Sequence, residues 1–170
     1  MSSKKMNSTQ QQQEQFTGNC LYLGLKCLAR DYSQIIDRAG RDTIGYYEFL
    51  SDIIQGEVIE KKKRHIDYLI KNSRLPQPLK MLADFDFDFQ PKLNRKLIMN
   101  LASLGFIPRN EWILLIGDNG TGKSHLARSL GLIACQSGYR TYYTTCSELI
   151  NDLNAGVYEK TLDKKTLLSD

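Results

Sequence analysis

A glycine-rich octapeptide in the second half of the chain has the residue types and spacing of a phosphate-binding loop. The residues Gly117-Asp118-Asn119-Gly120-Thr121-Gly122-Lys123-Ser124 fit the pattern G-x-x-x-x-G-K-[ST]. Glycines let the backbone wrap a phosphate with its N–H groups pointing inward. The lysine neutralises the terminal phosphates, and the serine hydroxyl holds Mg²⁺. The alternative is a glycine-rich turn between a strand and a helix, but the pattern predicts that this loop binds a nucleoside triphosphate.

The segments on either side of the loop must position it. Residues 112–116 are a short aliphatic run, which predicts a strand buried on both faces. Residues 125–135 have helical composition, with Leu126, Leu130 and Ile133 on one stripe. A helix that begins there directs its N-terminal N–H groups and the positive end of its dipole at the phosphates.

Composition and cysteine usage are ordinary for a soluble globular protein of 170 residues. No apolar run is long enough to span a bilayer, and the first residues lack the apolar core of a signal peptide. The cysteines show no C-x-x-C pairing, so we expect reduced apolar residues of a cytoplasmic protein, without a disulfide frame or zinc site. They are Cys20, Cys27, Cys135 and Cys146.

The positive charge is concentrated ahead of the loop. Residues 1–83 carry 13 Lys and Arg against 9 Asp and Glu, whereas residues 84–170 carry 10 of each. This asymmetry indicates an anionic partner for the first half, and a salt-dependent contact with a phosphate backbone is one interpretation. A solvated helix surface is the other. The candidate DNA-binding residues are Lys61, Lys62, Lys63, Arg64, Lys71 and Arg74.

Three regions are predicted along the chain. Residues 1–16 are polar and glutamine-rich, which predicts a disordered tail. Residues 19–80 show helical periodicity and predict a small all-α domain. One apolar stripe runs from Leu21 to Ile35, and a second helix follows, which Gly56 could break or kink. The prolines at 76 and 78 end the helical pattern, so we place a domain boundary near residue 80.

Residues 84–170 alternate between strand and helix signals. Phenylalanines at 85, 87 and 89 predict a half-buried strand or extended segment, and Pro91 predicts the start of a helix. Gly138 is a predicted helix end, residues 140–144 a predicted second strand, and Thr145 with Glu148 a capping box. This alternation predicts an α/β fold with a parallel sheet flanked by helices.

Together these motifs resemble a known family, the IstB-like ATP-binding proteins. The resemblance is carried by the Phe-rich lead-in of residues 85–91, by Gly120 to Ala127, and by Leu130 to Leu132 with Cys135 and Gly138 to Arg140. These are AAA+ ATPases, of the P-loop NTPase class, that assist the transposase of certain insertion sequences. They are similar to the DnaC-type loaders of the replicative helicase.

The resemblance implies a helical N-terminal domain for DNA and partner contact, followed by an ATPase domain. Such proteins assemble as homo-oligomers on duplex DNA with ATP and Mg²⁺ bound, and recruit a transposase. By the resemblance, Ser124 holds Mg²⁺, and the segment around Phe89 and Leu93 borders the adenine. The implied ATP-binding residues are Gly117, Asp118, Asn119, Gly120, Thr121, Gly122, Lys123, Ser124 and His125.

The sequence departs from the family after the loop. The family has a strand ending in Asp-Glu, which holds the metal and polarises water, followed by sensor residues and an arginine finger. No such strand follows Lys123 here, so we expect an incomplete sheet, no catalytic residue within this chain and poor hydrolysis. A truncated copy is the resulting expectation. A DnaC-like helicase loader, a non-hydrolysing remnant and a small-molecule P-loop kinase are the alternatives.

Overall fold

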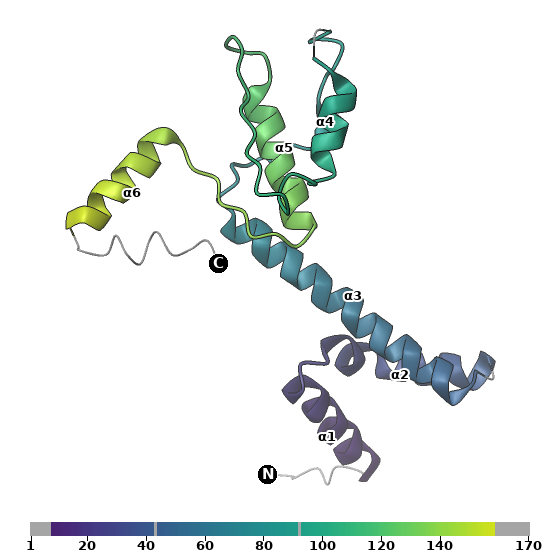
Figure 1. Cartoon of the computed structure of the whole chain (residues 1–170). Coiled ribbons are helices and arrows are strands. Elements are labelled where there is room, and N and C mark those ends of the chain that lie inside the picture. Colours follow the sequence, from purple (N-terminus) through teal and green to yellow (C-terminus); the bar gives the residue numbers. More distant parts are fainter. Residues whose placement is uncertain (1–7, 43, 92, 159–170) are drawn as a thin grey trace. The chain divides into compact units, whose positions relative to one another are not determined.

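The computed structural model describes residues 8–42, 44–91 and 93–158 (Figure 1). The chain divides into two compact units, residues 1–65 and residues 66–170, and the boundary between them lies inside the helix Tyr46–Asn72. The sequence predicted a boundary farther along, near residue 80. The helices are α1 (Ser8–Tyr22), α2 (Lys26–Asp42), α3 (Tyr46–Asn72), the 3₁₀ helix η1 (Leu82–Asp84), α4 (Arg95–Ala102), α5 (Lys123–Gln136) and α6 (Cys146–Tyr158).

The first helix begins inside the predicted disordered tail. Residues 8–16 belong to α1, so the expectation of disorder is wrong for them, while residues 1–7 lie outside the described residues. Glutamine and glutamate have good helix propensity, which favours a helix even without an apolar stripe. Phe16 also has a packing partner, because its ring meets the Tyr32 ring of α2 edge-on at a centroid distance of 5.2 Å.

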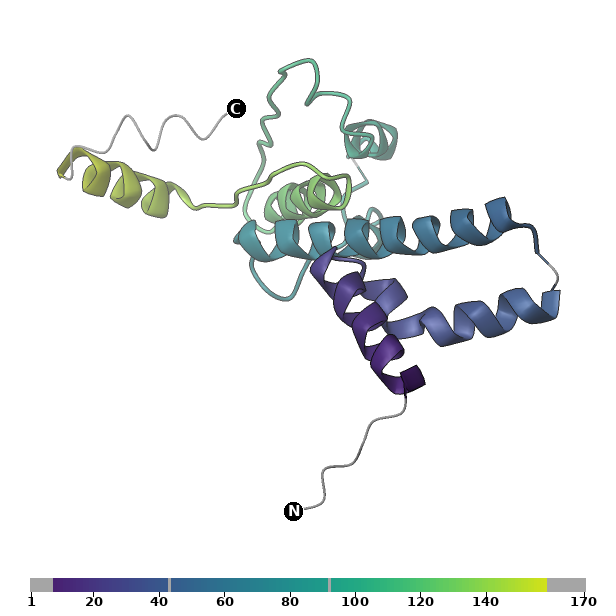
Figure 2. The same cartoon turned by 90° about the horizontal axis from the view of Figure 1, so that it is seen from below.

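Gly24 and Gly56 of the first unit place the helix ends differently from the sequence prediction. Gly24 has a φ of +76° and separates α1 from α2, so the stripe from Leu21 to Ile35 covers two helices instead of one. Gly56 lies within an unbroken α3. A Cβ at Gly56 would make an ordinary contact, 3.6 Å from the sulfur of Cys27, so α3 passes next to the start of α2 at this position. Figure 2 shows these two helices running side by side.

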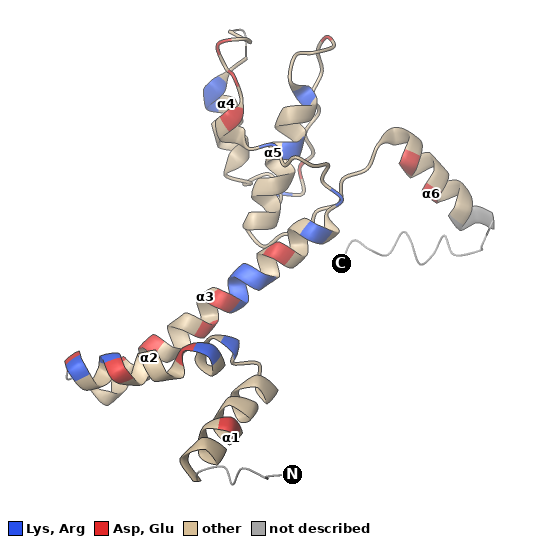
Figure 3. Ribbon diagram, turned by 180° about the vertical axis from the view of Figure 1, so that it is seen from behind, with Lys and Arg blue, Asp and Glu red and all other residues tan. Residues whose placement is uncertain are grey.

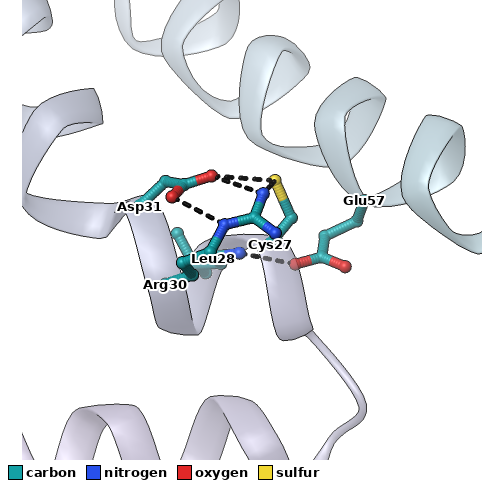
Figure 4. A network of polar contacts seen from close by, with 5 residues as sticks. All are labelled: Cys27, Leu28, Arg30, Asp31 and Glu57. Carbon is teal, nitrogen blue, oxygen red and sulfur yellow. Dashed lines mark hydrogen bonds and ion pairs between the residues drawn. The ribbon is translucent and has the colours of Figure 1, made fainter.

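A buried carboxylate joins α2 to α3 (Figure 4). Glu57 of α3 is only 8% exposed, and its Oε1 accepts the N–H of Leu28 at 2.6 Å. Leu28 lies in the first turn of α2, where backbone N–H groups have no partner within the helix. Glu57 therefore caps α2 from the neighbouring helix, and its negative charge lies at the positive end of the α2 dipole.

Next to this contact, α2 carries a thiol and an ion pair. The Cys27 thiol donates to Asp31 at 3.6 Å, and Arg30 pairs with Asp31 at 2.8 Å. Burial, followed by the hydrogen bond to Asp31, raises the pKa of the Cys27 thiol. The hydrogen bond from Arg30 lowers the pKa of Asp31. A thiol held in its neutral form is a poor nucleophile, so this network has a structural role.

The second unit is built around α5. One buried cluster joins Leu132 and Cys135 of α5 to Leu69 and Leu75. The other joins Leu126 to side chains from either side of η1 and from α4, with Phe85 and Ile98 at its centre. The two clusters contact different faces of α5 and leave its N-terminus, where the glycine-rich loop arrives, partly exposed.

The ends of α5 and the start of α6 follow the sequence prediction. Gly138 has a φ of +89° and donates its N–H to the Cys135 carbonyl at 3.0 Å, while Tyr139 donates to the Ala134 carbonyl at 2.9 Å. These two bonds make a Schellman motif. At the start of α6 a capping box forms, since the Thr145 N–H donates to Glu148 and the Glu148 N–H donates to the Thr145 hydroxyl.

Neither predicted strand forms in the described residues. Residues 112–116 and 140–144 have no regular structure, and no backbone hydrogen bond joins the two segments. A strand requires a ladder of such bonds with a neighbour, and neither segment has one. The side chains of residues 112–116 still alternate, because Ile113 and Leu115 line an open hollow of about 460 Å³ against α5 while Trp112 and Ile116 are exposed. The parallel sheet thus stays a prediction.

The phenylalanine-rich lead-in is also not a strand. After η1, the Asp86 side chain accepts the N–H groups of Asp88 and Phe89 at 2.9 and 3.1 Å, which turns the chain. Phe85 is buried and Phe89 is exposed, so the expected common face of the phenylalanines does not exist. The helix expected from Pro91 begins at Arg95, where the Asn94 side chain caps it by accepting the Leu97 N–H.

Candidate nucleotide-binding site

The glycines of the loop adopt conformations that other residues avoid. Gly120 and Gly122 have φ values of +78° and +85°, and Gly117 has a φ of +158°. Left-handed backbone at these positions bends residues 117–122 into a tight loop that enters α5 at Lys123. The glycines of the motif therefore allow the backbone to bend into the loop, which is the role that the sequence pattern predicts for them.

The N-terminus of α5 keeps its backbone donors free of protein acceptors. Gly122 is the N-cap, and no side chain caps the helix. The N–H groups of Lys123, Ser124 and His125 form no hydrogen bond within the described part of the chain, whereas the Leu126 N–H donates to the Gly122 carbonyl. Three adjacent donors at the positive end of a helix dipole fit an anion such as a phosphate group.

The side chains of the loop fit the same ligand. The Lys123 ammonium donates to the carbonyls of Gly117 and Asp118 at 2.7 and 2.6 Å, which places its charge inside the curve of the loop. The Thr121 hydroxyl donates to the Asp118 carbonyl at 2.8 Å and tightens the turn. Ser124 is exposed at the start of α5, and its hydroxyl forms no hydrogen bond with a described residue. A cation and a free hydroxyl thus flank the three backbone donors.

Two contacts behind the loop were not foreseen from the sequence. The Phe85 ring lies against Gly122, and the His125 ring meets Phe85 edge-on at a centroid distance of 5.3 Å. The Nε2 of His125 donates to the Met81 carbonyl at 2.8 Å. The imidazole of His125 is thus bonded to the lead-in segment, and only its backbone N–H belongs to the row of free donors. The sequence gives no direct sign of the contact between Phe85 and Gly122. The alternation of Phe85 with Phe87 predicted a strand instead.

The basic residues of α3 occupy several positions along the helix, with acidic positions among them (Figure 3). Lys61 and Arg64 line an open hollow beside the connection between α1 and α2, and the Arg64 Nε donates to the Glu60 carbonyl at 3.4 Å. Lys62 and Lys63 are exposed and do not line that hollow. Asp67 is the one acidic residue of α3 between Arg64 and Lys71. Within the first unit, the run therefore divides between two faces of the helix.

The remaining candidates for DNA contact belong to the second unit. Lys71 lies in the last turn of α3 and is exposed. Arg74 follows the helix with a φ of +55°, and its guanidinium lies 5.0 Å from the centre of the Tyr142 ring. The guanidinium of Arg74 therefore already has a partner in the second unit, the ring of Tyr142. Of the two residues expected near the adenine, Phe89 is exposed, and Leu93 packs against the cluster under the loop.

The described residues contain no group of three or more histidine, cysteine or acidic side chains that could hold a metal ion. No helix among them combines the length and the apolar character needed to cross a membrane. The four thiols named above are free, with Cys20 and Cys135 buried.

A left-handed glycine loop that enters an uncapped helix, with a lysine inside its curve, has the geometry of a phosphate-binding loop of the P-loop NTPase class. A family model described as "IstB-like ATP binding protein" matches residues 19–167. The chain belongs to this family, and the family implies the P-loop NTPase fold.

Relatives of the chain come from bacterial insertion sequences. The chain is 40% identical over 146 residues to the IS5376 protein of Geobacillus stearothermophilus, which is named as an ATP-binding protein. It is 30% identical to the IS232 protein of Bacillus thuringiensis and 34% identical to the IS21 protein of Pseudomonas aeruginosa, both named in the same way. The matches cover 86%, 89% and 84% of this chain but only 58%, 60% and 54% of the relatives.

Proposed function

We propose that this chain binds ATP through residues 117–125. The row of free N–H groups at Lys123, Ser124 and His125 carries the proposal, because these donors lie at the positive end of α5 next to the Lys123 ammonium. The backbone donors and the ammonium would hold the phosphates. The Ser124 hydroxyl would hold Mg²⁺, which neutralises the charge that the phosphates share. The names of the insertion-sequence relatives support ATP as the nucleotide.

We propose a helper of an insertion-sequence transposase as the wider role. The relatives named above belong to insertion sequences, which favours transposition over the loading of a replicative helicase. Membership of the IstB-like family argues against a small-molecule kinase. Duplex DNA, the transposase and further copies of the protein are the proposed partners. Residues 112–116 and 140–144 are proposed as strands of the parallel sheet that the P-loop NTPase fold contains.

The first test is the substitution Lys123→Ala, measured by titration of the 170-residue chain with ATP and Mg²⁺. Removing the ammonium should weaken nucleotide binding by at least about tenfold, since a charge-assisted bond to a phosphate is worth about 1.5–3 kcal/mol. Lys96→Ala is the matched control, because Lys96 is an exposed lysine of α4 and should leave the affinity unchanged. Equal affinity of Lys123→Ala and the parent would remove the proposal.

The second test concerns DNA and uses the exposed lysines of α3. The double substitution Lys62→Glu/Lys63→Glu should weaken binding to duplex DNA and lower the slope of log Kd against log salt by about 2, as expected for the loss of two phosphate contacts. Lys61→Glu tests the other face of the helix, and Lys96→Glu is its control, because both single substitutions change the net charge equally. An unchanged salt slope in the double variant would show that Lys62 and Lys63 do not contact DNA.

A further inference from the structure

Phe85 is a buried aromatic residue directly behind the phosphate loop. It follows η1, is 8% exposed and forms a cluster with Ile98 of α4 and Leu126 of α5. Its ring meets the Phe87 ring edge-on at a centroid distance of 4.9 Å and the His125 ring at 5.3 Å. Rings on two sides and aliphatic groups of the cluster therefore hold Phe85 in one place.

The ring edge of Phe85 occupies the space where Gly122 would carry a side chain. A Cβ built on Gly122 would lie 2.6 Å from Cε2 and 3.0 Å from Cζ of Phe85, closer than atoms can pack. Gly122 also has a φ of +85°, which a residue with a side chain rarely adopts. The junction between the loop and α5 thus rests directly on the Phe85 ring.

The segment that carries Phe85 is itself fixed along α5. His125 bonds to the Met81 carbonyl at 2.8 Å, and Arg128, one turn farther along α5, donates to the Pro76 carbonyl at 2.6 Å. These contacts mean that the Phe85 ring cannot follow the loop if the loop shifts.

We propose that Phe85 is a positioning residue of the phosphate loop, whose ring supports Gly122 and so holds the free N–H groups at the start of α5 in one orientation. The inference rests on the proposed nucleotide binding by residues 117–125. Phe85 touches no nucleotide in this scheme and acts through the Gly122 backbone. Preorganised donors bind a ligand without first losing conformational freedom, so a loop without this support should bind phosphates more weakly.

The test compares Phe85→Leu with Leu75→Ala in the full chain. Phe85 and Leu75 are both buried residues of the second unit, each is 8% exposed and each contacts α5. Only Phe85 lies next to the loop, so Leu75→Ala is the control. Phe85→Leu should weaken binding of Mg²⁺–ATP by about tenfold, well below the hundredfold that a displacement of about 1 Å can cost a catalytic site. Leu75→Ala should lower the unfolding temperature and leave the affinity within about twofold of the parent.

A second ligand separates positioning from direct contact. Tripolyphosphate has no base or sugar, so loss of loop support should weaken its binding by the same factor as that of ATP. Weaker ATP binding with unchanged tripolyphosphate binding would mean that Phe85 contacts the nucleoside, which would overturn the proposal. Phe85→Met covers the case in which Phe85→Leu does not fold, because the long, flexible methionine side chain can fill the space of the ring but lacks its rigid edge.

The inference and the proposed function fail in different ways. If Lys123→Ala binds ATP as the parent does, the proposed function is wrong and the role of Phe85 falls with it. If Lys123→Ala loses affinity while both Phe85 variants bind as Leu75→Ala does, only the inference is wrong. Both ideas are supported if the Phe85 variants lose affinity for ATP and tripolyphosphate equally.

Discussion

The N-termini of α2 and α5 solve the same chemical problem in opposite ways. The first turn of α2 receives the carboxylate of Glu57, which accepts the Leu28 N–H at 2.6 Å inside the protein. The first turn of α5 receives no side chain from the described residues, and its N-cap is a glycine. Both helix N-termini carry a positive partial charge and backbone N–H groups that have no acceptor within the helix. They differ in whether another side chain provides that acceptor.

Two other helices, α4 and α6, are also capped by side chains. Asn94 accepts the Leu97 N–H at the start of α4, and Thr145 with Glu148 forms a capping box at the start of α6. A helix N-terminus whose N–H groups are bonded to a protein side chain cannot offer them to a ligand. The N-terminus of α5 is uncapped and lies beside a lysine and a glycine-rich loop, so its N–H groups are available to a ligand. We therefore assign a binding function to α5 and not to α2.

The largest expected effect comes from giving α5 the acidic residue that it lacks. Ser124→Glu should place a carboxylate at the positive end of the helix and stabilise the fold by about 0.3–1 kcal/mol. The same charge repels phosphates, and like charges brought together cost several kcal/mol, so ATP binding should weaken by at least about a hundredfold. Calorimetric titration and thermal unfolding measure the two effects.

The control for this variant lies at the other end of the same helix. Ser137 is the C-cap residue of α5, and Ser137→Glu adds the same charge where the dipole is negative. It should lower the stability and leave the affinity for ATP unchanged. Retained ATP binding by Ser124→Glu would contradict the proposal that the α5 N-terminus is the phosphate site.

An intermediate effect is expected from removing the cap of α2. Glu57→Ala leaves the part-buried Leu28 N–H without its acceptor, which costs about 1–3 kcal/mol. Hydrogen exchange at the Leu28 amide should accelerate, while amides of α5 keep their rates. Glu57→Gln keeps a carbonyl acceptor at the same place and should retain most of the protection. Equal protection of Leu28 in the alanine variant and the parent would show that Glu57 does not cap α2.

The smallest effect should appear at α6 and depend on pH. Hydrogen bonds from the backbone and side chain of Thr145 lower the pKa of Glu148 below its ordinary value of 4.5. A lowered pKa in the folded state contributes stability above that ordinary value, and this contribution disappears as the pH falls through the folded value. Helix content followed by circular dichroism should therefore decrease on acidification by more in the parent than in Glu148→Gln. A parallel decrease in both proteins would count against the capping box.

Features that depend on a few neighbouring residues could be predicted from the sequence. The start of α5 after the glycine-rich loop, its end at Gly138 and the capping box at Thr145 all rest on contacts within about six residues. The glycine conformations of the loop also follow, because a left-handed backbone excludes most other residues.

Features that depend on distant partners could not be predicted. Residues 112–116 have strand composition, but a strand exists only when another segment pairs with it. Phe85 alternates with Phe87 as in a strand, yet the Asp86 side chain turns the chain instead. The link between Glu57 and Leu28 spans 29 positions and leaves no pattern in the sequence. The support of Gly122 by Phe85 belongs to the same group.

The open backbone of residues 112–116 has a consequence for handling this chain in solution. Trp112, Leu114 and Ile116 are 82%, 65% and 84% exposed, and none of them forms a backbone hydrogen bond with another residue that the structure describes. Short stretches of β-prone, uncharged residues with free backbone edges pair with copies of themselves. Concentrated samples should therefore precipitate or form β-rich aggregates, and a charged residue in place of Leu114 should raise the solubility without touching the phosphate loop.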